Sequence, residues 1–347
     1  MSKINANTEW GTLKEVILGR AEWAQVPRIK NKDIHCVDYA NIDDLSNMPG
    51  GQYPEDVINE TIEDLDVFQK QLEDIGVKVM RPIKFNHGVT HMSPDWSSDA
   101  YYSYCPRDSV LTIGDMLIET PMPLRSRYFE TFGMRSIFKE YFVNGSRWIA
   151  APKPRLPDKL YDRSDLNAPT LTEYEPAFDA ANCVKIGKDI LYLVSNSGNK
   201  MGARWLQSTL GEKYTVHMLE NVYAYVHLDT SIMPLAPGKV LLNPERVKEE
   251  QLPDIFDKWE KIWAPEPHET QVMHDWAPAS PWLGMNILSL SESLVAVEEN
   301  QINLTKTLED AGFDVMHVKM RHCRTLSGGP HCVTLDTVRE DEYADYR

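Results

Sequence analysis

Two distant stretches of this chain repeat one ten-residue pattern. QLEDIGVKVM at residues 71–80 recurs as TLEDAGFDVM at residues 307–316, sharing LED, the glycine that follows and a final VM. In the first copy the glycine comes after apolar residues at helical spacing: Ile58, Ile62, Leu65, Leu72 and Ile75. Glycine suits the C′ position of a helix, and a β-rich run follows it. The pattern predicts a unit of helix, glycine stop and strand.

The same unit is visible three more times, with decreasing clarity. These copies are RYFETFGMRSIFKEYFVNGSRWIAA, ARWLQSTLGEKYTVHML and PDIFDKWEKIWAP, in which Pro265 replaces the glycine. Ahead of each helix lies an apolar, β-branched stretch, usually broken by turn residues: VLTIGDMLIET, CVKIGKDILYLVS, IMPLAPGKVLLN and NILSLSESLVAV, with LKEVILG opening the chain. Each of the five units therefore reads strand, strand, helix, strand.

Repeats of this kind cannot bury their apolar helix faces singly, so they must pack against one another. A radial arrangement also covers the sheet edges that a linear stack would expose. We therefore predict an α/β fold in which residues 1–347 form a single domain, a five-bladed ββαβ propeller. The alternative is an ordinary α/β sandwich with coincidental periodicity.

Composition narrows the classes of function. The formal net charge of −16 disfavours nucleic acid and anionic membranes as partners, because both attract basic surfaces. No apolar run approaches the length of a membrane span, and the N-terminus shows neither a signal peptide nor a transit peptide. A cytoplasmic location is the default expectation.

The five cysteines, an odd number at scattered positions, do not suggest a disulfide framework. None forms a CxxC pair, and Cys323 and Cys332 lie too far apart in sequence for a usual zinc knuckle. We expect no structural metal.

Polar and nucleophilic residues recur near the beginning of successive units. They are Asp108 in CPRDSV, Asp179 in EPAFDAAN, His227 and Asp229 in YVHLDT, Ser280 in PASPWLGMN, and Cys332 in LSGGPHCVTLD. In a ring of equivalent units, such positions point toward one central axis. The sequence therefore predicts a site assembled from residues dozens of positions apart.

Within this set, Cys332 is the best candidate nucleophile because the Gly-rich turn before it leaves space beside the sulfur. His227 has the residue type for proton transfer near neutrality, and alternation along an extended segment would place Asp229 on the same face. Asp179 can orient the imidazole. Taken singly, each has an ordinary structural alternative: an inert buried thiol, a core histidine or a capping carboxylate.

In order along the chain, PRD, IETPMPLRSRYFE, AAPKP, EPAFDAAN, HLDT, NPER and GGPHC resemble the arginine amidinotransferases of the pentein superfamily. The likeness covers nearly the whole chain and is greatest to the inosamine-phosphate and glycine amidinotransferases. It implies a five-bladed propeller, L-arginine and an amine acceptor as substrates, no cofactor or metal, and a homodimer.

The resemblance also implies individual functions for the site residues. Cys332 would be the nucleophile, His227 the acid and base, and Asp179 its orienting partner. Asp108 and Asp229 would bind the guanidinium group, which suits paired carboxylates. The two further substrate-binding residues would be Arg246 in NPER, facing the substrate carboxylate, and Ser280, adding a hydrogen bond.

Departures from the family leave the acceptor open. Pro330 stands where relatives usually carry Phe, which alters the lining beside the nucleophile. An aminocyclitol phosphate, an amino acid such as glycine or a natural-product amine all remain candidates. Two other functions also remain: an arginine or agmatine deiminase, in which water resolves the intermediate, and an inactive propeller that serves as a binding module.

Overall fold

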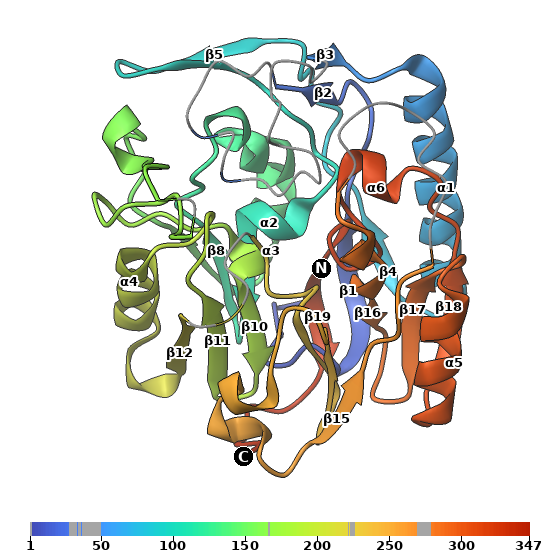
Figure 1. Ribbon diagram of the computed structural model, residues 1–347. Helices are drawn as coiled ribbons and strands as arrows, with labels where there is room; N and C mark the ends of the chain where they lie inside the picture. Colours follow the sequence, from blue (N-terminus) through green and yellow to red (C-terminus); the bar gives the residue numbers. More distant parts are fainter. Residues whose placement is uncertain are drawn as a thin grey trace.

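Five small sheets are arranged in a ring in the computed structural model (Figure 1). The model describes residues 2–27, 33, 36, 50–165, 167–220, 222, 226–268 and 279–347. Each of the five has three strands. Their orders are β19-β1-β4, β7-β8-β9, β10-β11-β12, β13-β14-β15 and β16-β17-β18. Two short two-stranded sheets, β2-β3 and β5-β6, lie outside this set.

Every three-stranded sheet follows one pattern, in which an antiparallel pair is extended by a parallel third strand. The strands are β1 (Thr12–Leu18), β4 (Lys78–Met80), β7 (Val110–Ile113), β8 (Met116–Glu119), β9 (Arg147–Ala150), β10 (Cys183–Ile186), β11 (Asp189–Leu193), β12 (Thr215–Leu219), β13 (Ile232–Ala236), β14 (Lys239–Leu242), β15 (Glu260–Trp263), β16 (Leu288–Ser289), β17 (Leu294–Glu298), β18 (Asp314–Val318) and β19 (Thr334–Glu340). The parallel strand needs a crossover connection, which explains where the helices fall.

Four of the five crossovers contain an α-helix: α1 (Glu55–Asp74), α3 (Arg135–Val143), α4 (Lys200–Leu210) and α5 (Ile302–Asp310). The remaining elements are short: β2 (Gln25–Val26), β3 (Gly51–Gln52), β5 (Thr90–Met92), β6 (Ser97–Asp99), α2 (Pro106–Ser109) and α6 (Cys323–Leu326). The predicted ββαβ propeller is thus confirmed as the fold. That residues 1–347 make a single domain stays a prediction.

The repeated decapeptide ends its two helices in the same way. Gly76 and Gly312 have φ values of 85° and 91°, the left-handed conformation that glycine adopts without strain. In α1, the N–H groups of Gly76 and Val77 donate to the carbonyls of Glu73 and Leu72, and α5 has the equivalent pair of bonds. Both copies form this C-terminal motif, which satisfies carbonyls that the helix leaves free.

The expected helix in PDIFDKWEKIWAP is wrong. Between β14 and β15 the chain forms two short 3-10 helices, Glu249–Gln251 and Asp254–Phe256, instead of an α-helix. Trp259, Phe256 and Ile255 are buried all the same. In this blade the apolar residues cover the sheet without forming an α-helix. Their spacing along the sequence resembles that of a helix, which is why the prediction failed.

The first blade is completed by both ends of the chain. β19, close to the C-terminus, pairs antiparallel with β1 from Thr12↔Glu340 to Leu18↔Thr334, and β4 pairs with β1 on its other side. This closure places Cys332, just before β19, beside segments from the start of the chain.

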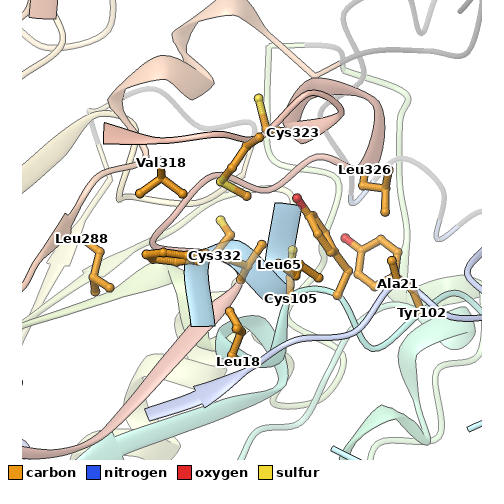
Figure 2. Packing of buried hydrophobic residues seen from close by; sticks show 14 of the residues in the cluster. Leu18, Ala21, Leu65, Tyr102, Cys105, Leu288, Val318, Cys323, Leu326 and Cys332 are labelled. Carbon is orange, nitrogen blue, oxygen red and sulfur yellow. The ribbon is translucent and has the colours of Figure 1, made fainter. Parts of the chain in front are cut away.

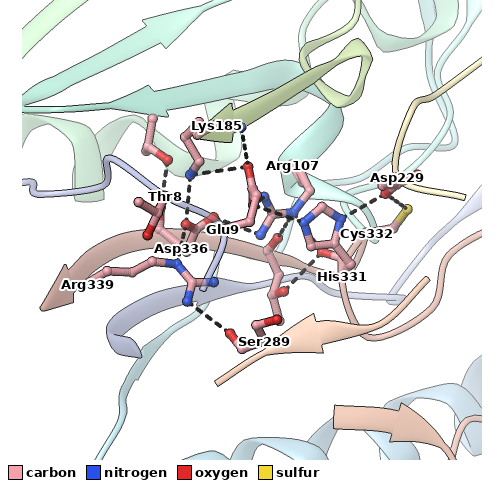
Figure 3. A network of polar contacts seen from close by, with 12 residues as sticks. Thr8, Glu9, Arg107, Lys185, Asp229, Ser289, His331, Cys332, Asp336 and Arg339 are labelled. Atoms are coloured by element: carbon pink, nitrogen blue, oxygen red, sulfur yellow. Dashed lines mark hydrogen bonds and ion pairs between the residues drawn. The ribbon is translucent and has the colours of Figure 1, made fainter. Parts of the chain in front are cut away.

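A network of buried charges lies beside these strands (Figure 3). Asp336 accepts from Lys185 at 2.8 Å and from Arg339 at 2.7 Å, and it pairs with Arg107 at 2.8 Å. Glu9 joins the network through Lys185 and Arg107. Buried charges require such mutual pairing, and this network links segments of three blades.

Among the described parts of the chain, none of the helices combines the length and the hydrophobicity needed to cross a bilayer.

Candidate active site

Six of the seven predicted site residues lie ahead of the first strand of a blade, whereas Arg246 follows β14. Asp108 lies in α2 before β7, Asp179 caps the 3-10 helix Ala180–Asn182 before β10, and Cys332 comes shortly before β19. His227 and Asp229 precede β13, and Ser280 caps the 3-10 helix before β16. Because equivalent ends of the blades meet at the axis, these loops converge there.

One cavity gathers all the predicted site residues. Its lining includes Asp108, Asp179, His227, Asp229, Arg246, Ser280 and Cys332. The structure therefore brings together every residue that the motifs singled out.

The candidate nucleophile lies at the inner end of the cavity. Cys332 is 2% exposed and packs in an apolar cluster with Cys105, Leu65 and Leu288 (Figure 2). The donor atoms of Asp108, His227 and Cys332 all lie within 4.8 Å of one another. Thiolate, imidazole and carboxylate are also ligand types that Zn²⁺ accepts, but Asp108 already holds an arginine, so covalent chemistry is the better assignment.

His227 connects the thiol to Asp179. Its Nε2 lies 2.9 Å from Asp179 Oδ2, and a ring nitrogen of His227 lies within 4.8 Å of the Cys332 sulfur. Asp179 is itself fixed, because its Oδ1 accepts from the backbone N–H of Ala181 at 2.8 Å. Burial disfavours the imidazolium, yet the charges of Asp179 and Asp108 outweigh it and raise the pKa of His227 well above its usual value.

The pKa of the Cys332 thiol is also raised. A hydrogen bond with the Cys105 thiol, burial and the charge of Asp229 all act in this direction. The resting site therefore favours a neutral thiol beside a protonated imidazole, in which His227 is ready to give a proton and Cys332 has still to lose one.

Two carboxylates flank the thiol, each with one oxygen uncommitted. Asp108 and Asp229 are 2% and 1% exposed. Within the described part of the chain, neither Asp108 Oδ1 nor Asp229 Oδ1 has a hydrogen-bond partner. Buried carboxylate oxygens are almost always paired, so these two atoms mark a place for a cationic donor.

Asp229 keeps its charge through His331. Burial raises its pKa, but the hydrogen bond and charge of His331, with His227 and Arg107, lower it to about 2. His331 Nδ1 lies 2.8 Å from Asp229 Oδ2, and its Nε2 lies 3.4 Å from Glu9 in the buried network (Figure 3). An anionic Asp229 at neutral pH follows from this support.

Arg127 is a wall residue that sequence reasoning did not assign. It is 4% exposed, and its Nη1 donates to Asp108 Oδ2 at 2.6 Å while its Nε donates to Glu130 at 2.9 Å. Its guanidinium also lies 5.1 Å from the ring of Tyr102. The motif RSRYFE could have predicted this buried ion pair, since it carries an arginine and a glutamate three residues apart beside apolar residues.

Arg246 and Ser280 lie together on the cavity wall. Arg246 donates to Thr230 Oγ1 at 2.8 Å and to Ser280 Oγ at 3.2 Å. Ser280 also accepts from the backbone N–H of Trp282. These contacts hold a cationic group within the cavity, where a substrate anion would find it.

One local expectation is wrong. His227 lies between two bends and Asp229 lies in a turn, both ahead of β13 and not on a strand, so strand alternation does not place them. They share the cavity because the turn at the start of the blade directs both side chains toward the axis. Asn286, which contacts Cys332, was not identified from sequence at all.

A cysteine-centred site at the axis of five ββαβ blades defines an enzyme of the pentein superfamily. The solved inosamine-phosphate amidinotransferase of Streptomyces griseus superposes with a TM-score of 0.96 at 43% identity, covering 100% of this chain and 99% of that one. The chain matches no protein-family model.

Two curated relatives agree with this comparison. Inosamine-phosphate amidinotransferase 1 of Streptomyces glaucescens is 42% identical over 348 residues, which is 100% of both chains. The mitochondrial glycine amidinotransferase of Gallus gallus is 35% identical, over 97% of this chain and 83% of its own length. The chain belongs to the amidinotransferase family and is an enzyme of that class, which confirms the predicted family. This result favours group transfer over a deiminase and over an inactive binding module.

Proposed function

We propose that this enzyme transfers the amidino group of L-arginine to an amine acceptor, through an S-amidino-cysteine formed on Cys332. The observation that carries the proposal is the pair of buried, uncommitted carboxylate oxygens, Asp108 Oδ1 and Asp229 Oδ1, in the cavity that contains the thiol. A guanidinium group is planar and permanently charged, and its N–H donors match two such acceptors. Held between them, its central carbon would face the sulfur.

In the first half-reaction, the positive charge of the bound guanidinium favours ionisation of Cys332, and the thiol proton leaves to solvent because His227 is already protonated. The resulting thiolate then attacks the guanidino carbon. The bond from that carbon to Nε of arginine then breaks, and His227 gives its proton to the departing amine so that ornithine leaves. The raised pKa of His227 supports this step, because the imidazole is protonated near neutrality. Asp179 keeps the ring oriented.

In the second half-reaction, the acceptor amine attacks the amidino carbon and the bond from carbon to sulfur breaks, returning an electron pair to Cys332. His227 now accepts the proton that the amine loses. The acceptor enters the cavity that ornithine has left, so the mechanism is ping-pong. All groups needed for these steps are side chains of this chain.

Arg246 would bind the α-carboxylate of the donor, assisted by Ser280. Its support is the position of its guanidinium, held by Thr230 and Ser280 on the wall of the cavity. An acceptor that carries a carboxylate or a phosphate could use the same group. Inosamine phosphates, glycine and other amino acids are therefore the acceptors to test first. Amines without a carboxylate or a phosphate, such as polyamines, serve as the comparison.

Intact-protein mass spectrometry tests the covalent step. Incubation with arginine should add about 42 Da to the wild type and nothing to Cys332→Ala. Cys323→Ala is the matched control, since Cys323 is buried in the same cluster but does not line the cavity. Decay of the adduct on adding one amine identifies the acceptor. Citrulline formation without an acceptor would instead show a hydrolase, and no adduct would refute arginine as the donor.

The homodimer and the cytoplasmic location stay predictions. They rest on the family resemblance and on the sequence of the N-terminus. Sedimentation of the purified protein at several concentrations would test the dimer, and fractionation of the producing cells would test the location.

A further inference from the structure

Asn286 contacts the candidate nucleophile, Cys332, at both its backbone and its sulfur. It is fully buried and directly follows the 3-10 helix Pro281–Met285. Its Oδ1 accepts from the backbone N–H of Cys332 at 2.9 Å, while its Nδ2 lies 3.1 Å from Cys332 Sγ. The same Nδ2 donates to Asp229 Oδ2 at 2.7 Å. One side chain thus holds both the main chain and the sulfur of the nucleophile.

The orientation of this amide is fixed by its partners. An amide oxygen and an amide nitrogen are alike in shape, so contacts must decide between them. The backbone N–H of Cys332 needs an acceptor, which places Oδ1 toward it. Nδ2 therefore faces the sulfur and a carboxylate oxygen, both of which accept hydrogen bonds.

Other groups around the sulfur disfavour the Cys332 thiolate, so the Asn286 Nδ2–H donor is important for stabilising it. The titratable groups that interact with Cys332 include Cys105, Asp229, His227, Asp108 and Tyr104. The two carboxylates disfavour a thiolate, and His227 favours it only while it is protonated. When His227 gives its proton to a leaving amine, the Asn286 amide is still able to donate to sulfur.

We propose that Asn286 is a catalytic residue whose Nδ2–H stabilises the Cys332 thiolate in both halves of the reaction. This inference rests on the proposed function. The thiolate is the attacking group in the first half, where the S–C bond forms and the C–N bond of arginine breaks. It is the leaving group in the second half, where the C–S bond breaks and its electron pair returns to sulfur.

Asn286 acts mainly on the charged form of the sulfur. A hydrogen bond to an anion is stronger than one to a neutral acceptor. In the S-amidino intermediate the sulfur carries no negative charge, so the hydrogen bond from Nδ2 weakens there. The residue then lowers both barriers relative to the intermediate, which is differential stabilisation and not uniform binding.

The first test measures the thiolate without any substrate. The rate at which iodoacetamide alkylates Cys332, followed by intact mass over a range of pH, gives the apparent pKa of the thiol. We expect Asn286→Ala to raise this pKa by about one unit, which means about tenfold slower alkylation at a fixed pH below it. Asn286→Asp keeps the acceptor for the Cys332 amide but loses the donor, and should raise the pKa at least as much.

Asn199→Ala is the matched control. Asn199 is also a buried asparagine with several hydrogen bonds, to Gly202, Ala177, Thr172 and Glu175, and it lies outside the cavity lining. Its loss should lower the melting temperature and leave the pKa of Cys332 unchanged. A merely structural asparagine at position 286 would behave in the same way as this control.

Steady-state kinetics provide the second test. Both Asn286 variants should lower kcat by at least about tenfold, with a smaller change in KM for the donor. Folded variants with a wild-type pKa of Cys332, or with a change in KM alone, would overturn the inference. If the wild type alkylates normally but forms no adduct with arginine, the proposed function fails, whereas the effect on the thiolate is still measured.

Discussion

The guanidinium of Arg127 donates to Asp108 across 2.6 Å, and this buried ion pair forms one wall of the cavity. It commits Oδ2 of the carboxylate and leaves Oδ1 open. Burial raises the pKa of Asp108, and the charge of Arg127 acts against that rise. In the proposed function, Arg127 thus leaves Asp108 Oδ1 open for the guanidinium group of the substrate arginine.

Replacing Arg127 should therefore damage binding of the donor. In Arg127→Met, Asp108 and Glu130 lose a buried counter-charge, and burial has already raised the pKa of Glu130 to about 8. We expect kcat/KM for arginine to fall at least about a hundredfold, because loss of one partner leaves a buried charge unpaired. Arg127→Lys should recover only part of the lost kcat/KM, since an ammonium group lacks the planar, forked geometry of a guanidinium.

Arg135→Met is the control for Arg127. Arg135 pairs with Glu119 but its side chain is 45% exposed and does not line the cavity. Its kinetics should match the wild type within about twofold. Equal losses in the two variants would contradict a specific effect of Arg127.

Asp179→Asn should move the pH profile of kcat. Because the charge of Asp179 helps to raise the pKa of His227, the substitution lowers that pKa and the imidazole loses its proton at a lower pH. The activity on the alkaline side should then decline earlier, with kcat reduced about a hundredfold or more. An alkaline limb at the wild-type position would refute the assignment of His227 as the acid.

Asp189→Asn provides the comparison for this profile. Asp189 makes a similar contact, 2.6 Å from His217 Nε2, but this pair lies outside the lining of the cavity. The profile of this variant should coincide with that of the wild type.

Asp229 should also affect stability in acid. Burial raises its pKa, but His331 and nearby cations lower it from 3.8 to about 2 in the folded chain. A lowered pKa contributes stability that is present above the unfolded value and is lost as the pH falls through about 4 to 2. Over that range the wild type should lose roughly 2 kcal/mol more of its free energy of unfolding than Asp229→Asn. Urea unfolding at a series of pH values measures the difference, and parallel curves would contradict it.

Gly328→Ala should displace the nucleophile. A Cβ at this position would lie 2.6 Å from Cys105 Sγ, 3.0 Å from the Tyr104 ring and 3.3 Å from the Cβ of Cys332. Relief of this crowding should cost about 1–3 kcal/mol of stability and slow formation of the adduct with arginine. At Gly133 the nearest contact would be 3.7 Å away, so Gly133→Ala is the control and should react normally. If Gly328→Ala forms the adduct at the wild-type rate, the space beside Cys332 is not needed for the reaction.

Local sequence determined the repeated unit and the candidate residues. The glycine stops at Gly76 and Gly312, the helix ahead of each and the strand after it depend on interactions within a few residues, which periodicity and glycine placement report directly. The motifs also identified Cys332, His227 and Asp179 one by one.

Tertiary structure alone decided what these residues meet. The pairing of β19 with β1, the contact of Asn286 with Cys332 and the contact of Arg127 with Asp108 depend on how whole blades pack. The missing helix before β15 is a similar case, because its apolar residues are buried in either geometry. Local preferences carry no information on the relative placement of distant segments, which is fixed only when the ring closes and its buried polar groups find partners.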